Sequence, residues 1–328
     1  MRKYLICLLV IVFAMCLLCS CKNSQEKKDD KEQEPVHIVT TIFPEYDWVQ
    51  NIIASNPGGF EVTLLVDNGV DLHSYQPSVE DIIKISTCDM FIYVGGESDE
   101  WVDDALAMAV NKNMTVIKLM DVLRDSVKEE EEIEGMQKTE TLEEQKKGPE
   151  YDEHVWLSLK NASKIVDRIS ESLQKLDEKN AETYKANAVS YKEKLSALDA
   201  EYTALTSTAA VKTLLFGDRF PFRYLTEDYG LTYYAAFPGC SAETEASFDT
   251  VAFLAEKLKD LSLPAVLTIE NSDAKVAETI IKTSGRSDVK MLVLDSIQSV
   301  TSKDIQNGTD YLSIMKGNLE VLRTALGK

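Results

Sequence analysis

Short apolar runs rich in β-branched residues alternate with segments of helical spacing along most of this 328-residue chain. In the first half, the predicted strands are HIVTTIF from His37, EVTLLV from Glu61, MFIYV from Met90 and MTVIKLM from Met114. Strands of this kind separated by helices are typical of parallel α/β sheets. Because ligand-binding loops in such sheets follow the carboxyl ends of strands, a functional site is expected in the loops after these runs.

The same alternation returns in the second half of the chain. After Thr208, the predicted strands VKTLLF, GLTYYAA, AVLTIE and MLVLDSI alternate with helices, and DYLSIMKGNLEVLRTAL closes the chain as a helix. Between the halves, the spacing of Ile165, Ile169 and Leu173 predicts a long helix with Ser158 as its N-cap, and a second long helix follows. The sequence therefore predicts two α/β lobes, each a mostly parallel sheet flanked by helices, joined by a long rigid helix.

We expect the N-terminal lobe at 36–157, the linking helix at 158–178 and the C-terminal lobe at 179–328. Within the first lobe, the stretch 126–153 is strongly acidic and of low complexity, with no aromatic residue before Tyr151. We interpret this stretch as a mobile surface loop.

The first 35 residues predict secretion and membrane attachment. Residues 1–20 have a short basic start and an apolar core too short to span a bilayer comfortably, as in a signal peptide. LCSC, ending at Cys21, resembles a bacterial lipobox, which implies cleavage before Cys21 and lipidation of this cysteine; an ordinary secretory signal with a chance cysteine is the alternative. The polar stretch 21–35 is expected to be a flexible tether, which places the chain on the extracellular face of the cell membrane.

The charge of the chain argues against nucleic-acid binding, and its cysteine content leaves two cysteines in the folded part. Loss of Arg2 and Lys3 with the signal removes two positive charges, so the formal net charge of −20 becomes −22. Such a charge disfavours binding to nucleic acid. Four of the six cysteines lie at or before Cys21, so Cys88 and Cys240 remain for the folded part, and a bridge between them stays open.

The chain contains no GxSxG, Walker-type, HExxH or early GxGxxG motif, which argues against an enzyme. It has three histidines, of which His37 lies inside a predicted strand and is interpreted as structural. His73 in DLHSYQPS follows a strand, and His154 in YDEHVWLSLKNA precedes the central helix. Imidazole is the commonest protein ligand of divalent transition metals, so two histidines at loop ends of one lobe predict a metal site.

Carboxylates at matching loop ends of the second lobe are candidates to complete this site. Asp218 in LLFGDRF follows the first strand of that lobe, and Asp295 in MLVLDSI ends the last one. Each aspartate alone also fits a cap or a turn. Together with His73 and His154, they predict a metal-binding cleft between the lobes.

With these motifs, the chain resembles the metal-binding lipoproteins that deliver zinc or manganese to ABC importers. The resemblance covers residues 36–328 and is carried by TTIFPEYDWVQNI, HSYQPSVEDI, DEHVWLSLKNA, DYGL, AETEAS, LVLDSI and YLSIMKGNLEVL. It implies two lobes with one metal between them, a small lobe movement, a permease partner in the membrane and no enzymatic activity. By position, His73, His154 and Asp295 match three family ligands.

The remaining family ligand, a histidine or a glutamate, falls on Arg219, and arginine cannot ligate a cation. We favour Asp218 in its place. Cys240, Glu243 or Glu245 of PGCSAETEAS are alternatives, as is a site of three protein ligands plus water. Another alternative is that Arg219 pairs with a carboxylate and leaves a poor or differently used site.

Two imidazoles with two carboxylates suit zinc, manganese or iron, and zinc outcompetes manganese at most nitrogen and oxygen sites. A thiolate from Cys240 favours zinc strongly. Zinc is therefore the expected transported ligand, with manganese as the alternative. The acidic loop lacks the histidines that zinc-specific members often carry there, so a second tight site is not expected; weak cation collection is an alternative to a plain solvated loop.

The leading hypothesis is a monomeric binding protein that captures a divalent transition metal outside the cell and delivers it to an ABC permease. A surface adhesin on the same fold is the alternative, because members of this family have also been described as adhesins. A secreted metallohydrolase is a third hypothesis, but no residue is an evident general base.

Overall fold

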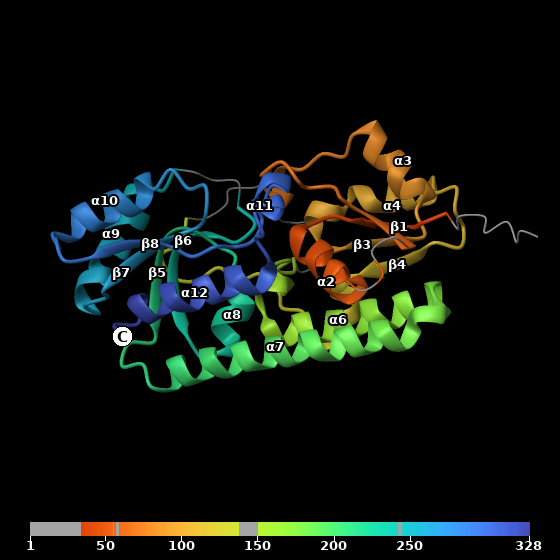
Figure 1. The fold of residues 1–328 in the computed structure, drawn as a ribbon. Coiled ribbons are helices and arrows are strands. Elements are labelled where there is room, and N and C mark those ends of the chain that lie inside the picture. Colours follow the sequence, from red (N-terminus) through yellow and green to blue (C-terminus); the bar gives the residue numbers. More distant parts are fainter. Residues whose placement is uncertain (1–33, 55, 57–58, 138–149, 242–244) are drawn as a thin grey trace, which may run out of the picture. The chain divides into compact units, whose positions relative to one another are not determined.

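The first four predicted strands form one parallel sheet in the order β2-β1-β3-β4 (Figure 1). β3 is buried along its whole length, which explains its unbroken apolar run. The strands are β1 (Val36–Thr40), β2 (Phe60–Leu64), β3 (Met90–Tyr93) and β4 (Thr115–Lys118). The helices of this half are α2 (Phe43–Ile53), α3 (Val79–Thr87), α4 (Trp101–Ala107) and α5 (Leu119–Leu123), with 3₁₀ turns η2 (Leu72–Ser74), η3 (Glu97–Asp99) and η4 (Arg124–Ser126).

The second half repeats this arrangement with a parallel sheet in the order β6-β5-β7-β8. The register between β5 and β6 shifts between Phe216 and Arg219, so the end of β5 is irregular where a ligand was predicted. The strands are β5 (Thr213–Phe220), β6 (Thr232–Pro238), β7 (Ala265–Thr268) and β8 (Lys290–Val293). The helices are α8 (Arg223–Asp228), α9 (Phe248–Asp260), α10 (Lys275–Ser284), α11 (Ser302–Gln306) and α12 (Tyr311–Ala325).

This computed structural model describes residues 34–54, 56, 59–137, 150–241 and 245–328. The predicted signal peptide, Cys21, most of the tether and Glu243 lie outside the described residues. Val36–Lys328 form one compact unit. In the described part of the chain, no helix is both long enough and apolar enough to cross a membrane.

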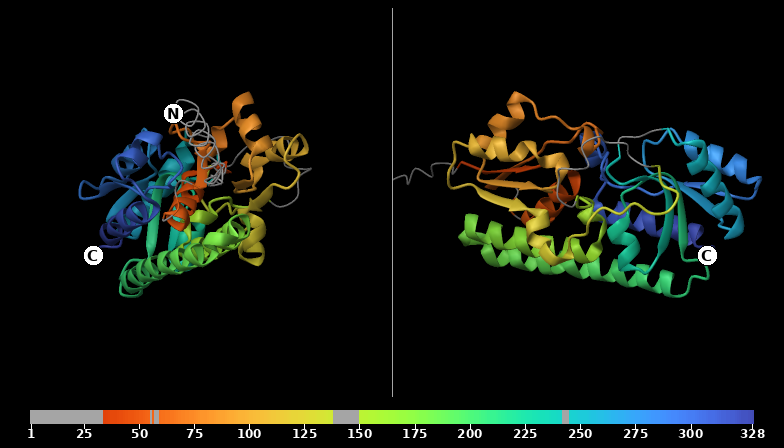
Figure 2. Two further views of the ribbon diagram at one scale, coloured as in Figure 1. Left: turned by 45° about the vertical axis from the view of Figure 1, so that its right-hand side comes forward. Right: turned by 180° about the vertical axis from the view of Figure 1, so that it is seen from behind.

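Two long helices, α6 (Leu159–Leu176) and α7 (Ala181–Ser207), separate the sheets in sequence and run alongside each other (Figure 2). They follow the 3₁₀ turns η5 (Val155–Leu157) and η6 (Glu178–Asn180), respectively. As predicted, the Ser158 side chain caps α6 by accepting a hydrogen bond from the backbone N–H of Asn161. α7 contacts both halves: Asn187 donates to the carbonyl of Ile52 on α2, and Tyr202 donates to that of Met315 on α12.

The fold class is confirmed as two lobes, each a parallel sheet flanked by helices. Division of the chain at residues 158 and 178 stays a prediction, and α7 contacts α2 of the first half and α12 of the second.

Buried aromatic residues pack where the two halves meet. The rings of Trp48 on α2 and Tyr311 on α12 meet edge to face with centroids 5.3 Å apart. The Tyr311 hydroxyl donates to the carbonyl of Trp156 at 2.7 Å, and the indole N–H of Trp156 donates to the carbonyl of Ser296 at 2.9 Å. All three aromatic side chains are fully buried, so one core extends from the first sheet to the second.

The described flanks of the acidic stretch 126–153 are hydrogen-bonded. Glu130 N–H donates to the carbonyl of Glu150, and Asp152 N–H donates to that of Lys128. Gln137 N–H donates to the carbonyl of Ala236 on β6, so this flank also lies against the second sheet. Residues 138–149 of the predicted mobile loop lie outside the described residues.

The buried carboxyl of Asp47 on α2 predicts a pH-dependent stability. Burial raises its pKa to about 7, although it accepts a hydrogen bond from Tyr191. A carboxyl whose folded pKa exceeds its unfolded value binds more protons in the folded state, so its contribution to stability is lost as pH rises towards 7. We expect Asp47→Asn to raise the free energy of unfolding at pH 8 by at least about 1 kcal/mol, and to change it much less at pH 4. Urea unfolding at both values, with exposed Asp260→Asn as the control, measures the difference; equal effects at both pH values contradict it.

Candidate metal centre

His73 lies in η2, in the loop between β2 and α3. Asp71 caps this short turn by accepting a hydrogen bond from the His73 backbone N–H at 3.0 Å. The imidazole Nδ1 lies 2.7 Å from the hydroxyl oxygen of Ser98, which belongs to η3 after β3. The loops after β2 and β3, the two strands on either side of β1, therefore hold one imidazole between them.

His154 is fully buried directly before η5. Asp152 Oδ1 accepts a hydrogen bond from its backbone N–H at 2.9 Å and lies 3.0 Å from its Nδ1. A carboxylate at Nδ1 holds the proton on that nitrogen and leaves Nε2 with a lone pair. The motif DEH thus contains both the imidazole and the group that orients it.

Glu153 is linked to His73 through Ser98. Its carboxylate accepts a hydrogen bond from the Ser98 backbone N–H at 2.7 Å. The Ser98 hydroxyl is hydrogen-bonded to His73 Nδ1, so the Nε2 atom of His73 is the ring nitrogen directed towards His154. Glu153 Oε2 is buried without a hydrogen-bond partner, 3.8 Å from His73 Nδ1.

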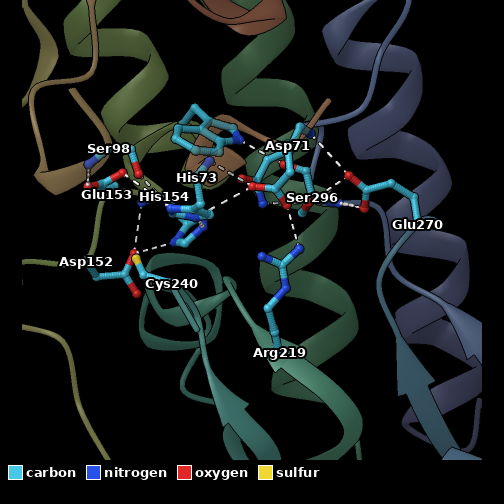
Figure 3. A network of polar contacts seen from close by, with 12 residues as sticks. Asp71, His73, Ser98, Asp152, Glu153, His154, Arg219, Cys240, Glu270 and Ser296 are labelled. Atoms are coloured by element: carbon cyan, nitrogen blue, oxygen red, sulfur yellow. Dashed lines mark hydrogen bonds and ion pairs between the residues drawn. The ribbon is translucent and has the colours of Figure 1, made fainter. Parts of the chain in front are cut away.

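The two imidazoles face each other through their Nε2 atoms, which are 3.2 Å apart (Figure 3). Nitrogen ligands of a tetrahedral zinc ion, at about 2.0–2.1 Å from the metal, lie about 3.4 Å from each other. The observed separation is therefore close to that of two nitrogens that share one cation.

The electrostatic environment of the two rings differs. Burial, followed by the charge of His154, lowers the pKa of His73 to about 3. Burial also opposes protonation of His154, but the charge and hydrogen bond of Asp152 outweigh it and raise the pKa of His154. His73 is thus a neutral imidazole at physiological pH, the form in which this side chain binds metals.

Cys240 follows β6 and reaches the histidines from the second lobe. One atom each of His73, His154 and Cys240 lies within 4.8 Å of the others, a spacing that can hold a metal ion. The Cys240 backbone N–H donates to Glu130 Oε1 at 3.1 Å. Burial, followed by the charge of Glu130, raises the pKa of its thiol well above the usual range. Cys88 and Cys240 are both free thiols, so the possible bridge between them is not formed.

Arg219, at the end of β5, pairs with a carboxylate rather than approaching the histidines. Its Nη2 lies 2.5 Å from Asp71 Oδ2, and this ion pair joins the second lobe to the turn that carries His73. Burial opposes ionisation of Asp71, but the charge of Arg219 outweighs it and holds the pKa of Asp71 below its usual range. The structure therefore agrees with the alternative in which Arg219 pairs with a carboxylate.

The structure does not bring the predicted carboxylates into the three-residue group. Asp218 Oδ1 accepts a hydrogen bond from the Arg219 backbone N–H, and its Oδ2 is buried without a partner. Asp295 Oδ1 accepts from Ile297 N–H, and burial followed by the charge of Glu270 raises the pKa of Asp295 to about 7. Glu245 is exposed. The roles of these carboxylates as ligands stay predictions.

Sequence reasoning missed the residues that orient the two imidazoles. Asp71, Asp152 and Glu153 stand beside the histidines in DLH and DEH, so their position was a usable signal. Ser98 and Glu130 are distant in sequence from the residues they contact and carry no such signal.

Comparison with known proteins identifies relatives of this chain by sequence and by fold. Residues 38–325 match the family model ZnuA, described as zinc-uptake complex component A, periplasmic. The chain is 33% identical over 319 residues to the zinc-binding lipoprotein AdcA of Streptococcus pneumoniae, covering 97% of this chain and 60% of that protein. It is 30% identical over 327 residues to the high-affinity zinc uptake system protein ZnuA of Bacillus subtilis, covering 97% of each.

The structure is similar to the Zn(II)-bound ZnuA-like domain of Streptococcus pneumoniae AdcA, with a TM-score of 0.69 and 30% identity over 90% of this chain and 100% of that one. The chain spans about half the length of the streptococcal relatives, 55% of the Streptococcus pyogenes zinc-binding protein AdcA.

The Asp71–Arg219 pair predicts a measurable coupling between the lobes. Both side chains are mostly buried, so solvent screens their attraction less than it screens a surface pair. We expect a double-mutant cycle of Asp71→Asn and Arg219→Met to give a coupling of about 1–3 kcal/mol in urea unfolding. The exposed pair Asp273–Lys275 is the control, and its coupling is expected to be close to zero because solvent screens it. Equal coupling in both cycles is the contrary result.

Proposed function

The chain belongs to the ZnuA zinc-uptake family, and on that premise we propose that it captures zinc outside the cell and delivers it to an ABC importer permease in the membrane. The family consists of solute-binding transport proteins rather than enzymes, which agrees with the absence of catalytic motifs in the sequence. His73 and His154 are the proposed zinc ligands. Manganese is the alternative cargo.

The observation that carries this proposal is the pair of Nε2 atoms 3.2 Å apart. Both Nδ1 atoms have oxygen partners, Ser98 for His73 and Asp152 for His154, so the Nε2 atoms of both rings face the space between them. Without a metal, the two Nε2 atoms form a hydrogen bond in which one of them carries the proton, and a cation that replaces this proton has both nitrogens as ligands. The arrangement thus resembles a metal site in which partners at Nδ1 set the ring orientation.

The surroundings of the two rings support a transition metal rather than calcium or magnesium. Neutral imidazole is a ligand of zinc, copper, iron and nickel, whereas Ca²⁺ and Mg²⁺ take oxygen ligands. Asp152 lies at Nδ1 of His154, and Glu153 accepts a hydrogen bond from Ser98, the residue bonded to His73. We therefore assign these carboxylates to orienting the imidazole ligands. The names of the curated relatives, which are zinc-binding or zinc-uptake proteins, favour zinc within this class.

Substitution of the paired histidines tests the site. We expect His73→Ala and His154→Ala, each in the chain from Lys22 onward, to lower zinc affinity at least about 100-fold, more than loss of an outer partner typically costs. Competition with a chromophoric chelator measures the affinity, and metal analysis measures the stoichiometry, expected to be one ion.

The third histidine provides a matched control. His37 lies on β1 with its ring about half exposed and pairs with Glu61, so His37→Ala should bind zinc as the unaltered chain does. Wild-type affinity in both His73→Ala and His154→Ala contradicts the proposed site. For delivery, cells of the source organism that lack this chain should accumulate less zinc under zinc limitation, and His154→Ala should not restore accumulation.

Attachment to the membrane through lipid on Cys21 is part of the proposal, as is a monomeric state. The lipobox-like LCSC sequence supports the lipid attachment, and a relative is named as a lipoprotein. We expect Cys21→Ala to abolish incorporation of labelled fatty acid and to release the chain from the membrane fraction, while Cys88→Ala leaves both unchanged. Labelling that persists in Cys21→Ala overturns the assignment.

A further inference from the structure

Resting on the proposed function, we propose that Cys240 binds the metal as a thiolate, so that His73 Nε2, His154 Nε2 and Cys240 Sγ form one site with two nitrogen ligands and one sulfur ligand. This site selects thiophilic cations, zinc before manganese. Cys240 takes the place of the family ligand that is absent at Arg219.

The distances allow this ligand set with a small movement. In a tetrahedral zinc site, with Zn–S about 2.3 Å and Zn–N about 2.0–2.1 Å, sulfur and nitrogen lie about 3.5 Å apart. The Cys240 thiol and one ring nitrogen from each histidine already lie within 4.8 Å of one another, and Figure 3 shows the three side chains together. Closing this gap requires a shift on the order of 1 Å, which a rotation of the Cys240 side chain or a slight approach of the lobes can supply.

The backbone before Cys240 is shaped for close approach to His154. A Cβ at Gly239 would lie 2.9 Å from the Phe220 carbonyl oxygen and 3.1 Å from His154 Cε1. Any larger residue there would push the Cys240 turn away from the ring. The Cys240 backbone N–H is held by Glu130 at 3.1 Å, so the turn is fixed on its other side as well.

Strand topology explains how a cysteine can substitute for the lost ligand. β5 and β6 are neighbouring parallel strands, and Arg219 is in register with Phe237. Their carboxyl ends therefore meet at the same edge of the sheet, so the turn after β6 reaches the region that the end of β5 faces. Arg219 is held away from the histidines by Asp71, and the turn after β6 carries Cys240 towards them.

The charges around this ligand set favour a bound cation. On binding, the Cys240 S–H bond breaks, the S–Zn bond forms and the proton leaves to solvent, so zinc with one thiolate retains one positive charge. Asp152 and Glu153 lie at the two imidazoles and supply negative charge to this centre. The Asp71–Arg219 pair is neutral as a unit, so it adds no net repulsion.

A thiolate changes which metals the site accepts. Zinc binds sulfur ligands strongly, whereas manganese prefers carboxylate, carbonyl and water oxygen. We expect Cys240→Ser to weaken zinc binding at least about tenfold and to leave manganese binding within about twofold, so that the ratio of zinc to manganese affinity falls.

Cobalt(II) provides a direct probe of the Cys240 ligand. The cobalt complex of the chain from Lys22 onward, which includes the whole compact unit Val36–Lys328, should show a thiolate-to-cobalt charge-transfer band in the near ultraviolet. Cys240→Ser should lose this band and keep the visible d–d bands. Cys88→Ser is the matched control, because Cys88 is buried beside Met114 in the first lobe and should leave the band unchanged.

Alkylation of Cys240 in the unaltered chain tests the assignment even if the Cys240→Ser variant misfolds. Zinc should protect Cys240 from alkylation by iodoacetamide, as located by peptide mass analysis, and chelator should restore its reactivity. Absence of both the band and the protection overturns the Cys240 assignment while zinc binding through His73 and His154 still supports the proposed function. Wild-type zinc affinity in both histidine variants instead contradicts the proposed function itself.

Discussion

The buried segment from Asp152 to Ser158 connects the histidine pair to the packing of both lobes. Asp152 orients His154, and two residues later the Trp156 indole donates to the Ser296 carbonyl after β8. Tyr311 of α12 donates back to the Trp156 carbonyl, and Ser158 caps α6. One short segment therefore carries the His154 imidazole and also packs against the second lobe. The position of this imidazole depends on the buried core shared by the two lobes as well as on the local turn.

Around the two imidazoles, carboxylates orient donors and balance charge. Asp152 holds His154 directly, Glu153 holds His73 through Ser98, and Asp71 forms the turn that carries His73. The group whose ligand atoms lie within 4.8 Å of one another consists of His73, His154 and Cys240, so its donor atoms are nitrogen and sulfur. That donor set favours soft or borderline cations over calcium and magnesium.

Much of this arrangement could be predicted from local patterns. Alternating apolar runs and helical spacing indicated two parallel α/β lobes, and both sheets have this form. The rule that loops at strand carboxyl ends carry function placed His73 after β2 and pointed to the end of β5. The preference for Asp218 as the substitute ligand was reasoned from its neighbour Arg219, but a one-residue step along a strand turns a side chain to the other face. In the structure, Asp218 bonds the Arg219 backbone and lies outside the group formed by the histidines and Cys240.

The sequence by itself determined the fold class, the two histidine motifs and the absence of a usable ligand at Arg219, because each follows from periodicity, residue type or position within one short stretch. Only the tertiary structure decided which side chains meet. Arg219 forms an ion pair with Asp71, and Glu130 accepts a hydrogen bond from the backbone of Cys240. Cys240, from the second lobe, lies close to the two histidines of the first. The physical reason is that these contacts join residues far apart in the chain. Their distances are set by strand order, by the register shift at the end of β5 and by the buried core between the lobes.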